Sequence, residues 1–214
     1  MVEPLTYPDP PPAPPAPLWT NPIPGESGFL ALYDALVDEA DPRREYVVVE
    51  IGLGIGHSIA HLLHRVVESG KPIRVVGVDP FLSTTGRNGE QQERGDAAGG
   101  DFNFFLSEFA KLDRRERERL ELLRTTSVLA SRLFEARSVD LVLVDGNHDY
   151  EYVADDLALW WPKVRTGGLL AGDDCCEPYG VPNAARDFVG GTSLDIRRPR
   201  EGERGNPYFV VRKA

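Results

Sequence analysis

Residues 47–58 read Val-Val-Val-Glu-Ile-Gly-Leu-Gly-Ile-Gly-His-Ser, an apolar run that ends in an acid and three alternating glycines. A short run rich in β-branched residues predicts a strand. Gly52, Gly54 and Gly56 predict a turn at which the backbone can approach a ligand closely, because glycine has no Cβ atom. The apolar spacing of residues 58–67 predicts a helix. Together these features predict a nucleotide-type ligand site at the carboxyl end of a parallel sheet, with a plain connecting turn as the alternative.

The glycine spacing differs from that of a dinucleotide site. A G-x-G-x-x-G fingerprint would place its third glycine where this chain has His57. The pattern here is Glu50 followed by glycine at every second position, which resembles the first motif of class I S-adenosylmethionine-dependent methyltransferases. The methionine part of that cofactor carries no pyrophosphate, so the site needs no phosphate cradle. We expect Glu50 to receive the cofactor's ammonium group, directly or through water, and Ser58 to line the same site with the three glycines.

Composition limits the classes of function. The chain has 214 residues, which is enough for one domain with a sizeable core. Its 34 acidic and 24 basic residues give a net charge of −10. This charge argues against non-specific binding to nucleic acid or to an anionic membrane, with a local basic patch as the alternative. No apolar stretch has the length of a membrane span, and the N-terminus has no apolar signal core. Adjacent Cys175 and Cys176 predict reduced thiols, so we expect a cytoplasmic protein.

The chain divides into an arm and a domain. The polyproline tract at residues 8–17 predicts an extended N-terminal arm over residues 1–26, and residues 27–214 form the predicted methyltransferase domain. The arm is either a flexible tail or a segment that docks on a partner or across an oligomer interface. Residues 83–101 are polar and rich in glycine, which predicts either an active-site lid or surface disorder.

Strands and helices alternate through the domain. This pattern predicts an α/β fold, a Rossmann-like, doubly wound and mostly parallel sheet with helices on both faces and an antiparallel closing strand. The expected strands are residues 47–51, 73–79, 120–127, 139–145 and 167–173, with 194–198 and 208–212 as a closing pair. The expected helices are residues 28–39, 57–69, 102–112, 128–136, 149–161 and 184–189.

Asp79 ends the second predicted strand, at a spacing of roughly 20 residues from the glycine turn. An acid at this place in a βαβ unit reaches the ribose hydroxyls of a bound nucleoside. We therefore expect Asp79 and the adjoining Pro80 to bind the cofactor. The alternative is a loop acid that caps the Pro80–Phe81 segment.

Acids also follow the fourth and fifth predicted strands. Asp145 ends one buried strand and is followed by His148, and Asp173 and Asp174 end the next. The carboxyl ends of parallel strands share one edge of the sheet, so these acids are expected to converge. Such carboxylates repel one another unless they are protonated or bind a cation. Oxygen ligands favour Mg²⁺, ahead of Mn²⁺, at Asp145, Asp173 and Asp174. The alternative is that one acid caps a helix and another points to solvent.

These segments resemble methyltransferase family 24, which includes macrocin-type sugar O-methyltransferases and is similar to the catechol type. The resemblance covers about residues 45–190 and rests on Asp145-Gly-Asn-His-Asp-Tyr150, Trp160-Trp161-Pro162 and Gly172-Asp173-Asp174. It implies that the three acids bind Mg²⁺, and Asp174 is similar to the macrocin type because the catechol type has asparagine there. Many family members have an acid where this chain has Asn147, so the resemblance gives no base at this position. The resemblance also places Ser127, or Thr126, near the adenine.

The sequence therefore predicts an S-adenosylmethionine-dependent methyltransferase that methylates a hydroxyl of a small molecule, a sugar or a phenol. His148 is the first candidate for general base and Asp149 the second. Asp145 is expected to contact both the cofactor and the metal. His148 could instead cap the following helix. The alternatives for the whole protein are a nicotinamide-dependent oxidoreductase and a non-catalytic binding protein. A hydroxylated small-molecule substrate and a possible homo-oligomer are the expected partners, with no nucleic acid and no membrane.

Overall fold

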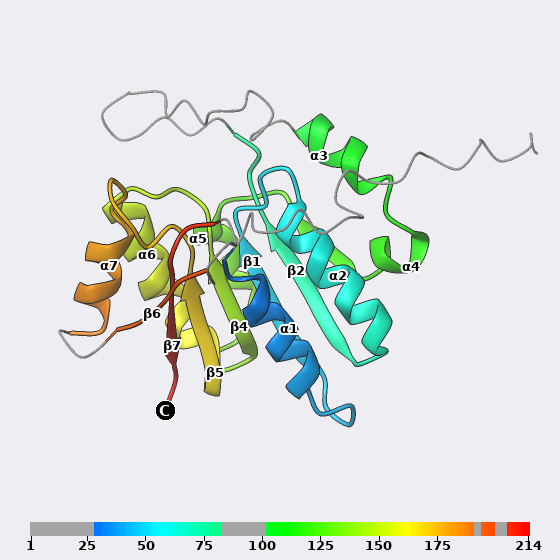
Figure 1. Cartoon of the computed structure of the whole chain (residues 1–214), viewed down its shortest axis with the longest axis horizontal. Helices are drawn as coiled ribbons and strands as arrows, with labels where there is room; N and C mark the ends of the chain where they lie inside the picture. Colours follow the sequence, from blue (N-terminus) through cyan, green and yellow to red (C-terminus); the bar gives the residue numbers. More distant parts are fainter. Residues whose placement is uncertain (1–27, 83–101, 191–193, 200–204) are drawn as a thin grey trace, which may run out of the picture.

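The computed structural model describes residues 28–82, 102–190, 194–199 and 205–214 (Figure 1). The predicted arm and the predicted lid at residues 83–101 lie outside the described residues. The strands form one sheet in the order β3-β2-β1-β4-β5-β7-β6. The first five strands are parallel, whereas β7 is antiparallel to both of its neighbours. Their bounds are β1 Tyr46–Ile51, β2 Ile73–Val78, β3 Leu120–Leu123, β4 Val139–Val144, β5 Val164–Gly172, β6 Asp195–Arg197 and β7 Tyr208–Arg212.

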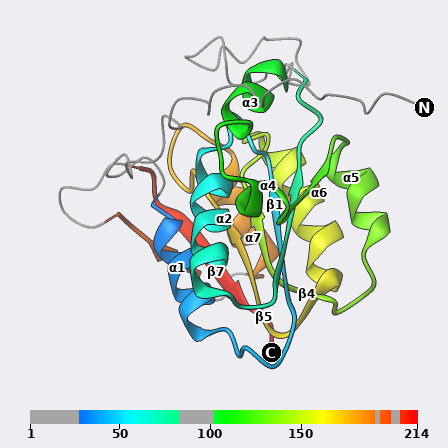
Figure 2. The same cartoon turned by 90° about the vertical axis from the view of Figure 1, so that its right-hand side faces the viewer.

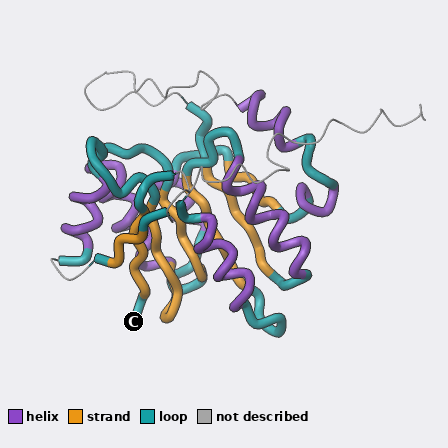
Figure 3. Tube along the Cα trace, viewed as in Figure 1, coloured by secondary structure: helices purple, strands orange, loops and turns teal. Residues whose placement is uncertain are grey.

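Helices cover both faces of the sheet, which confirms the predicted Rossmann-like architecture (Figures 2 and 3). Helices α1 and α2 lie side by side on one face, and α6 and α7 lie together on the other (Figure 1). The α-helices are α1 Leu30–Glu39, α2 His57–Ser69, α3 Phe102–Phe109, α4 Arg114–Arg117, α5 Ser127–Ala130, α6 Tyr150–Trp160 and α7 Val181–Phe188. Two 3₁₀ turns, η1 Ser131–Leu133 and η2 Trp161–Lys163, follow α5 and α6.

The alternation of side chains along the strands explains the two layers of core. Val48 of β1 faces α1 and α2, whereas its neighbour Val49 faces α6 and α7. Leu141 and Val142 of β4 divide in the same way. Because central strands are apolar on both faces, each face must be covered by helices.

The region after β3 differs from the sequence prediction. The third strand ends at Leu123 rather than at residue 127, and Ser127 begins α5. The helix expected over 128–136 is replaced by the short α5 and η1. The Thr126 hydroxyl oxygen accepts a hydrogen bond from the Leu129 N–H and caps α5, so a helix begins within the segment that was expected to be strand.

Within the described ranges, no helix combines the length and apolar character needed to cross a membrane. Cys175 and Cys176 are free thiols, as predicted. The parallel strands place their carboxyl ends at one edge of the sheet, and the connections that leave this edge carry the candidate site.

Candidate active site

Three glycines bend the chain between β1 and α2. Gly52, Gly54 and Gly56 have positive φ angles of 86°, 52° and 90°. Residues with a Cβ atom rarely adopt such angles. Gly52 also has no space for a side chain, since an ideal Cβ atom would lie 2.1 Å from the carbonyl oxygen of Asp145. The glycine turn therefore lies directly against the end of β4.

Asp79 holds the glycine turn from the end of β2. Its Oδ2 accepts hydrogen bonds from the N–H groups of Leu53 and Gly54, at 2.8 and 3.2 Å, and its Oδ1 accepts one from Phe81 at 2.6 Å. The bond to the Phe81 N–H shows that Asp79 also caps the Pro80–Phe81 segment, which was the alternative role. A carboxylate oxygen can accept two hydrogen bonds, so Oδ1 retains a position for a ribose hydroxyl. Ribose binding by Asp79 and the partly buried Pro80 stays a prediction.

Glu50 lies beneath the glycine turn and is completely buried. Its Oε2 accepts a hydrogen bond from the Tyr33 hydroxyl at 2.7 Å, and its Oε1 accepts one from the Ser58 hydroxyl. Burial raises the pKa of Glu50 to about 8, although both hydrogen bonds act in the opposite direction. The sequence predicted that Glu50 and Ser58 contact the cofactor. The structure shows that they bond to each other, and it adds Tyr33.

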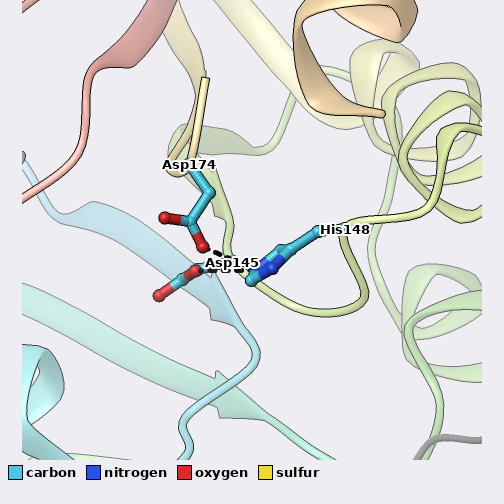
Figure 4. Close-up of side chains that lie close together, drawn as sticks. All are labelled: Asp145, His148 and Asp174. Carbon is cyan, nitrogen blue, oxygen red and sulfur yellow. Dashed lines mark ion pairs between the residues drawn. The ribbon is translucent and has the colours of Figure 1, made fainter. Parts of the chain in front are cut away.

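Asp145, His148 and Asp174 come together beyond the carboxyl ends of β4 and β5 (Figure 4). One ligand atom from each lies within 4.8 Å of the others. Nε2 of His148 is 3.0 Å from Oδ2 of Asp174 and 3.6 Å from Oδ1 of Asp145. Figure 4 shows the imidazole pointing toward the two carboxylates. The predicted base, His148, therefore lies next to two of the three predicted metal ligands, Asp145 and Asp174.

Asp173 is not a member of this group among the residues that the structure describes. Its Oδ1 is buried and has no hydrogen-bond partner in the described part of the chain. Burial, followed by the charges of Asp145 and Asp174, raises the pKa of Asp173 to about 9. A nearby cation would favour the ionised carboxylate. Asp145 and Asp174 could therefore act as ligands of a divalent cation, and Asp173 directly precedes Asp174 in the chain.

Two residues outside the predicted catalytic and metal-binding set, Asn206 and Tyr179, contact this cluster. Asn206, just before β7, donates a hydrogen bond from Nδ2 to Oδ1 of Asp174. The ring of Tyr179 lies edge-on to His148, with 4.9 Å between the ring centroids. Neither residue belongs to a recognisable motif. They reach the site only because the loop after β5 and the entry to β7 fold against it.

Asp149 and Ser127 have surroundings that the sequence did not predict. Asp149 precedes α6, and its backbone N–H donates to Oδ1 of Asn147 at 2.8 Å. The Ser127 hydroxyl donates to Asp156 and accepts from the indole N–H of Trp160 at 2.7 Å. This hydroxyl therefore ties α5 to α6. The roles of Asp149 as second base and of Ser127 at the adenine stay predictions.

The central part of the chain matches a known family. A family profile described as a methyltransferase domain matches residues 49–175, more than half of the chain. The chain belongs to methyltransferase family 24. The match includes the glycine turn and ends just after Asp174. This protein is therefore an S-adenosylmethionine-dependent methyltransferase, and the nicotinamide-dependent alternative is rejected.

Solved structures with the same fold come from several kinds of methyltransferase. The O-methyltransferase NovP is 17% identical, with a TM-score of 0.62 over 87% of this chain and 80% of NovP. CalS11, a TDP-rhamnose 3′-O-methyltransferase of calicheamicin biosynthesis, is 18% identical, with a TM-score of 0.52 over 84% of this chain and 77% of CalS11. An rRNA methylase from Streptococcus thermophilus is 14% identical, with a TM-score of 0.55 over 86% of this chain and 94% of that protein. Among curated proteins, no sequence matches this family 24 methyltransferase.

Proposed function

We propose that this family 24 methyltransferase transfers a methyl group from S-adenosylmethionine to a hydroxyl of a small molecule, with the help of a divalent cation, Mg²⁺ ahead of Mn²⁺. The observation that carries the proposal is the group formed by Asp145, His148 and Asp174 beside the glycine turn. A hydroxyl must lose its proton to become a good nucleophile, and this group offers both a base and carboxylate ligands. The NovP and CalS11 O-methyltransferases, which share the fold, support oxygen as the acceptor.

The acceptor is a small molecule rather than a nucleic acid. Some structures with this fold are rRNA methylases. Proteins that bind nucleic acid use basic residues to neutralise phosphates. The net charge of −10 opposes such binding.

The proposed reaction moves the methyl group in line from sulfur to oxygen, so that the C–S bond breaks as the C–O bond forms. Asp145 and Asp174, with Asp173 beside them, would hold the cation. When bound, the cation lowers the pKa of an acceptor hydroxyl. His148 accepts the hydroxyl proton at Nε2, and the Asp174 carboxylate 3.0 Å away stabilises the imidazolium that results. With His148 as the base, the ligands that this chain would offer to the cation are carboxylates.

A methyl-transfer assay tests the proposal. We expect labelled methyl from S-adenosylmethionine to appear as a methyl ether on a member of a panel of phenols and sugar nucleotides, with Mg²⁺ and not with EDTA. His148→Gln should lower kcat by about 10²–10⁴-fold and leave the affinity for S-adenosylhomocysteine unchanged. His61→Gln is the matched control, because the His61 imidazole contacts Asp34 between α1 and α2. Transfer to nitrogen, or undiminished transfer in EDTA, would contradict the proposal.

A further inference from the structure

The buried carboxyl group of Glu50 has a partner at each oxygen. The Tyr33 hydroxyl donates to Oε2 at 2.7 Å, and the Ser58 hydroxyl donates to Oε1. Tyr33 comes from α1 and Ser58 from the first turn of α2, so the carboxyl group joins two helices to β1. Burial and the neighbouring Glu50 raise the pKa of Tyr33, which keeps this hydroxyl protonated and able to donate.

Glu50 does not present a surface to a ligand. Its exposed fraction is 0%, whereas the side chain of Asp145, on the other side of the turn, is 26% exposed. A group that binds a small molecule directly must be reachable by it. The oxygens of Glu50 are instead enclosed by Tyr33, which is itself fully buried, and by Ser58.

The contacts of Glu50 fix the chain on both sides of the glycine turn. The strand residue Glu50 precedes the turn, and Ser58 follows it at the start of α2. The residue before α2 is Gly56, which offers no side chain to cap the helix. The bond between Glu50 and Ser58 thus closes the turn from beneath, and Tyr33 orients the carboxyl group that makes it.

We propose that Tyr33 is a positioning residue for the cofactor turn, which acts through Glu50 and Ser58, and that Glu50 supports the turn without binding the ammonium group of the cofactor. Phe29 supports Tyr33 in turn, with its ring edge-on at 5.5 Å between centroids. The proposal rests on the use of S-adenosylmethionine by the family and is independent of the acceptor that is methylated.

Calorimetric titration with S-adenosylhomocysteine tests this role. Tyr33→Phe removes only the hydroxyl and should weaken binding about tenfold, as should Ser58→Ala. Tyr46→Phe is the matched control, because the Tyr46 hydroxyl accepts its hydrogen bond from the backbone of Asp41, remote from the turn. This control should bind within about twofold of the wild type.

Glu50→Gln separates support from direct binding. Glutamine keeps one acceptor and one donor for the two hydroxyls, so it should weaken binding no more than Tyr33→Phe does. The double variant Tyr33→Phe/Glu50→Gln should lose less affinity than the sum of the two single losses.

Two results would overturn the proposal. A loss of 100-fold or more for Glu50→Gln with full affinity in Tyr33→Phe would show a direct ionic contact with the cofactor. A lower melting temperature in both Tyr33→Phe and Ser58→Ala with unchanged affinity would show that the hydroxyls serve stability alone. A wild-type protein that fails to bind S-adenosylhomocysteine would instead overturn the cofactor assignment, and the methyl-transfer assay tests the acceptor separately.

Discussion

Gly52 and Gly70 have similar backbone conformations but differ in the space that each leaves for a side chain. Gly52 and Gly70 have φ angles of 86° and 64°. A Cβ atom at Gly70 would meet nothing within 4 Å, whereas at Gly52 it would lie 2.1 Å from a backbone oxygen. We expect Gly70→Ala to cost about 1 kcal/mol of unfolding free energy from backbone strain alone, with normal cofactor affinity. Gly52→Ala should cost several times as much, about 3 kcal/mol or more, and should abolish binding of S-adenosylhomocysteine. Denaturant unfolding and calorimetry measure both effects, and equal costs at the two sites would contradict the argument.

The sequence predicts single residues well where a motif fixes them to the end of a strand. Glu50, Asp145 and Asp174 could be found because each directly ends or follows an apolar run. Tyr33 and Asn206 could not, because a helix and a loop far along the chain bring them to the site. The sequence also could not show that Glu50 bonds to Ser58, since that depends on how the side chain turns.

At the scale of elements, one hydroxyl joins α5 to α6. Ser127 bonds to Asp156 and to the fully buried Trp160. Ser127→Ala leaves the indole N–H and the carboxyl group without this partner, so we expect a loss of about 1–3 kcal/mol in unfolding free energy. Because the hydroxyl is turned toward α6, the affinity for S-adenosylhomocysteine should change less than about threefold. Ser107→Ala is the control, since its exposed hydroxyl donates to the Phe104 carbonyl oxygen within α3. A large loss of affinity with full stability would instead assign the hydroxyl to the adenine.

The buried carboxylate of Asp140 connects β1, β4 and β5 at the end of the sheet opposite the candidate site. Asp140 of β4 accepts hydrogen bonds from the Val47 N–H of β1 at 2.9 Å, from Arg44 at 2.6 Å and from Arg165 of β5. Asp140→Ala leaves these donors unpaired, and we expect it to lower the unfolding free energy by about 2–4 kcal/mol with unchanged cofactor affinity. Glu121→Ala, which breaks an exposed ion pair with a strand arginine, should cost less than about 1 kcal/mol. Chemical denaturation measures the unfolding free energy of both variants. Equal losses for Asp140→Ala and Glu121→Ala would show that the hydrogen bonds of Asp140 contribute no more to stability than an exposed ion pair does.

The same acid explains why the fifth strand was predicted too short. The sequence predicts a strand that starts at Gly167, but β5 begins at Val164. The register against β4 shifts between Val164 and Leu169, and Arg165 bonds to Asp140 within this irregular part. Tertiary contacts therefore extend a strand through residues whose local preference opposes it.

Across the whole molecule, buried acids make stability depend on pH. Burial raises the pKa of Glu50 from 4.5 to about 8 and that of Asp156 from 3.8 to about 6. The folded protein therefore keeps protons that the unfolded chain releases, so each contribution is complete below the ordinary pKa and is lost as the pH rises through the raised one. We expect the unfolding free energy to fall as the pH rises, by up to about 1.4 kcal/mol per pH unit for each proton. Glu50→Gln should flatten the curve mainly between pH 5 and 8, and Asp156→Asn between pH 4 and 6. Denaturant unfolding at several pH values between 4 and 8 measures these effects. If the variants and the wild type show the same dependence of unfolding free energy on pH, neither carboxyl group keeps its proton in the folded protein.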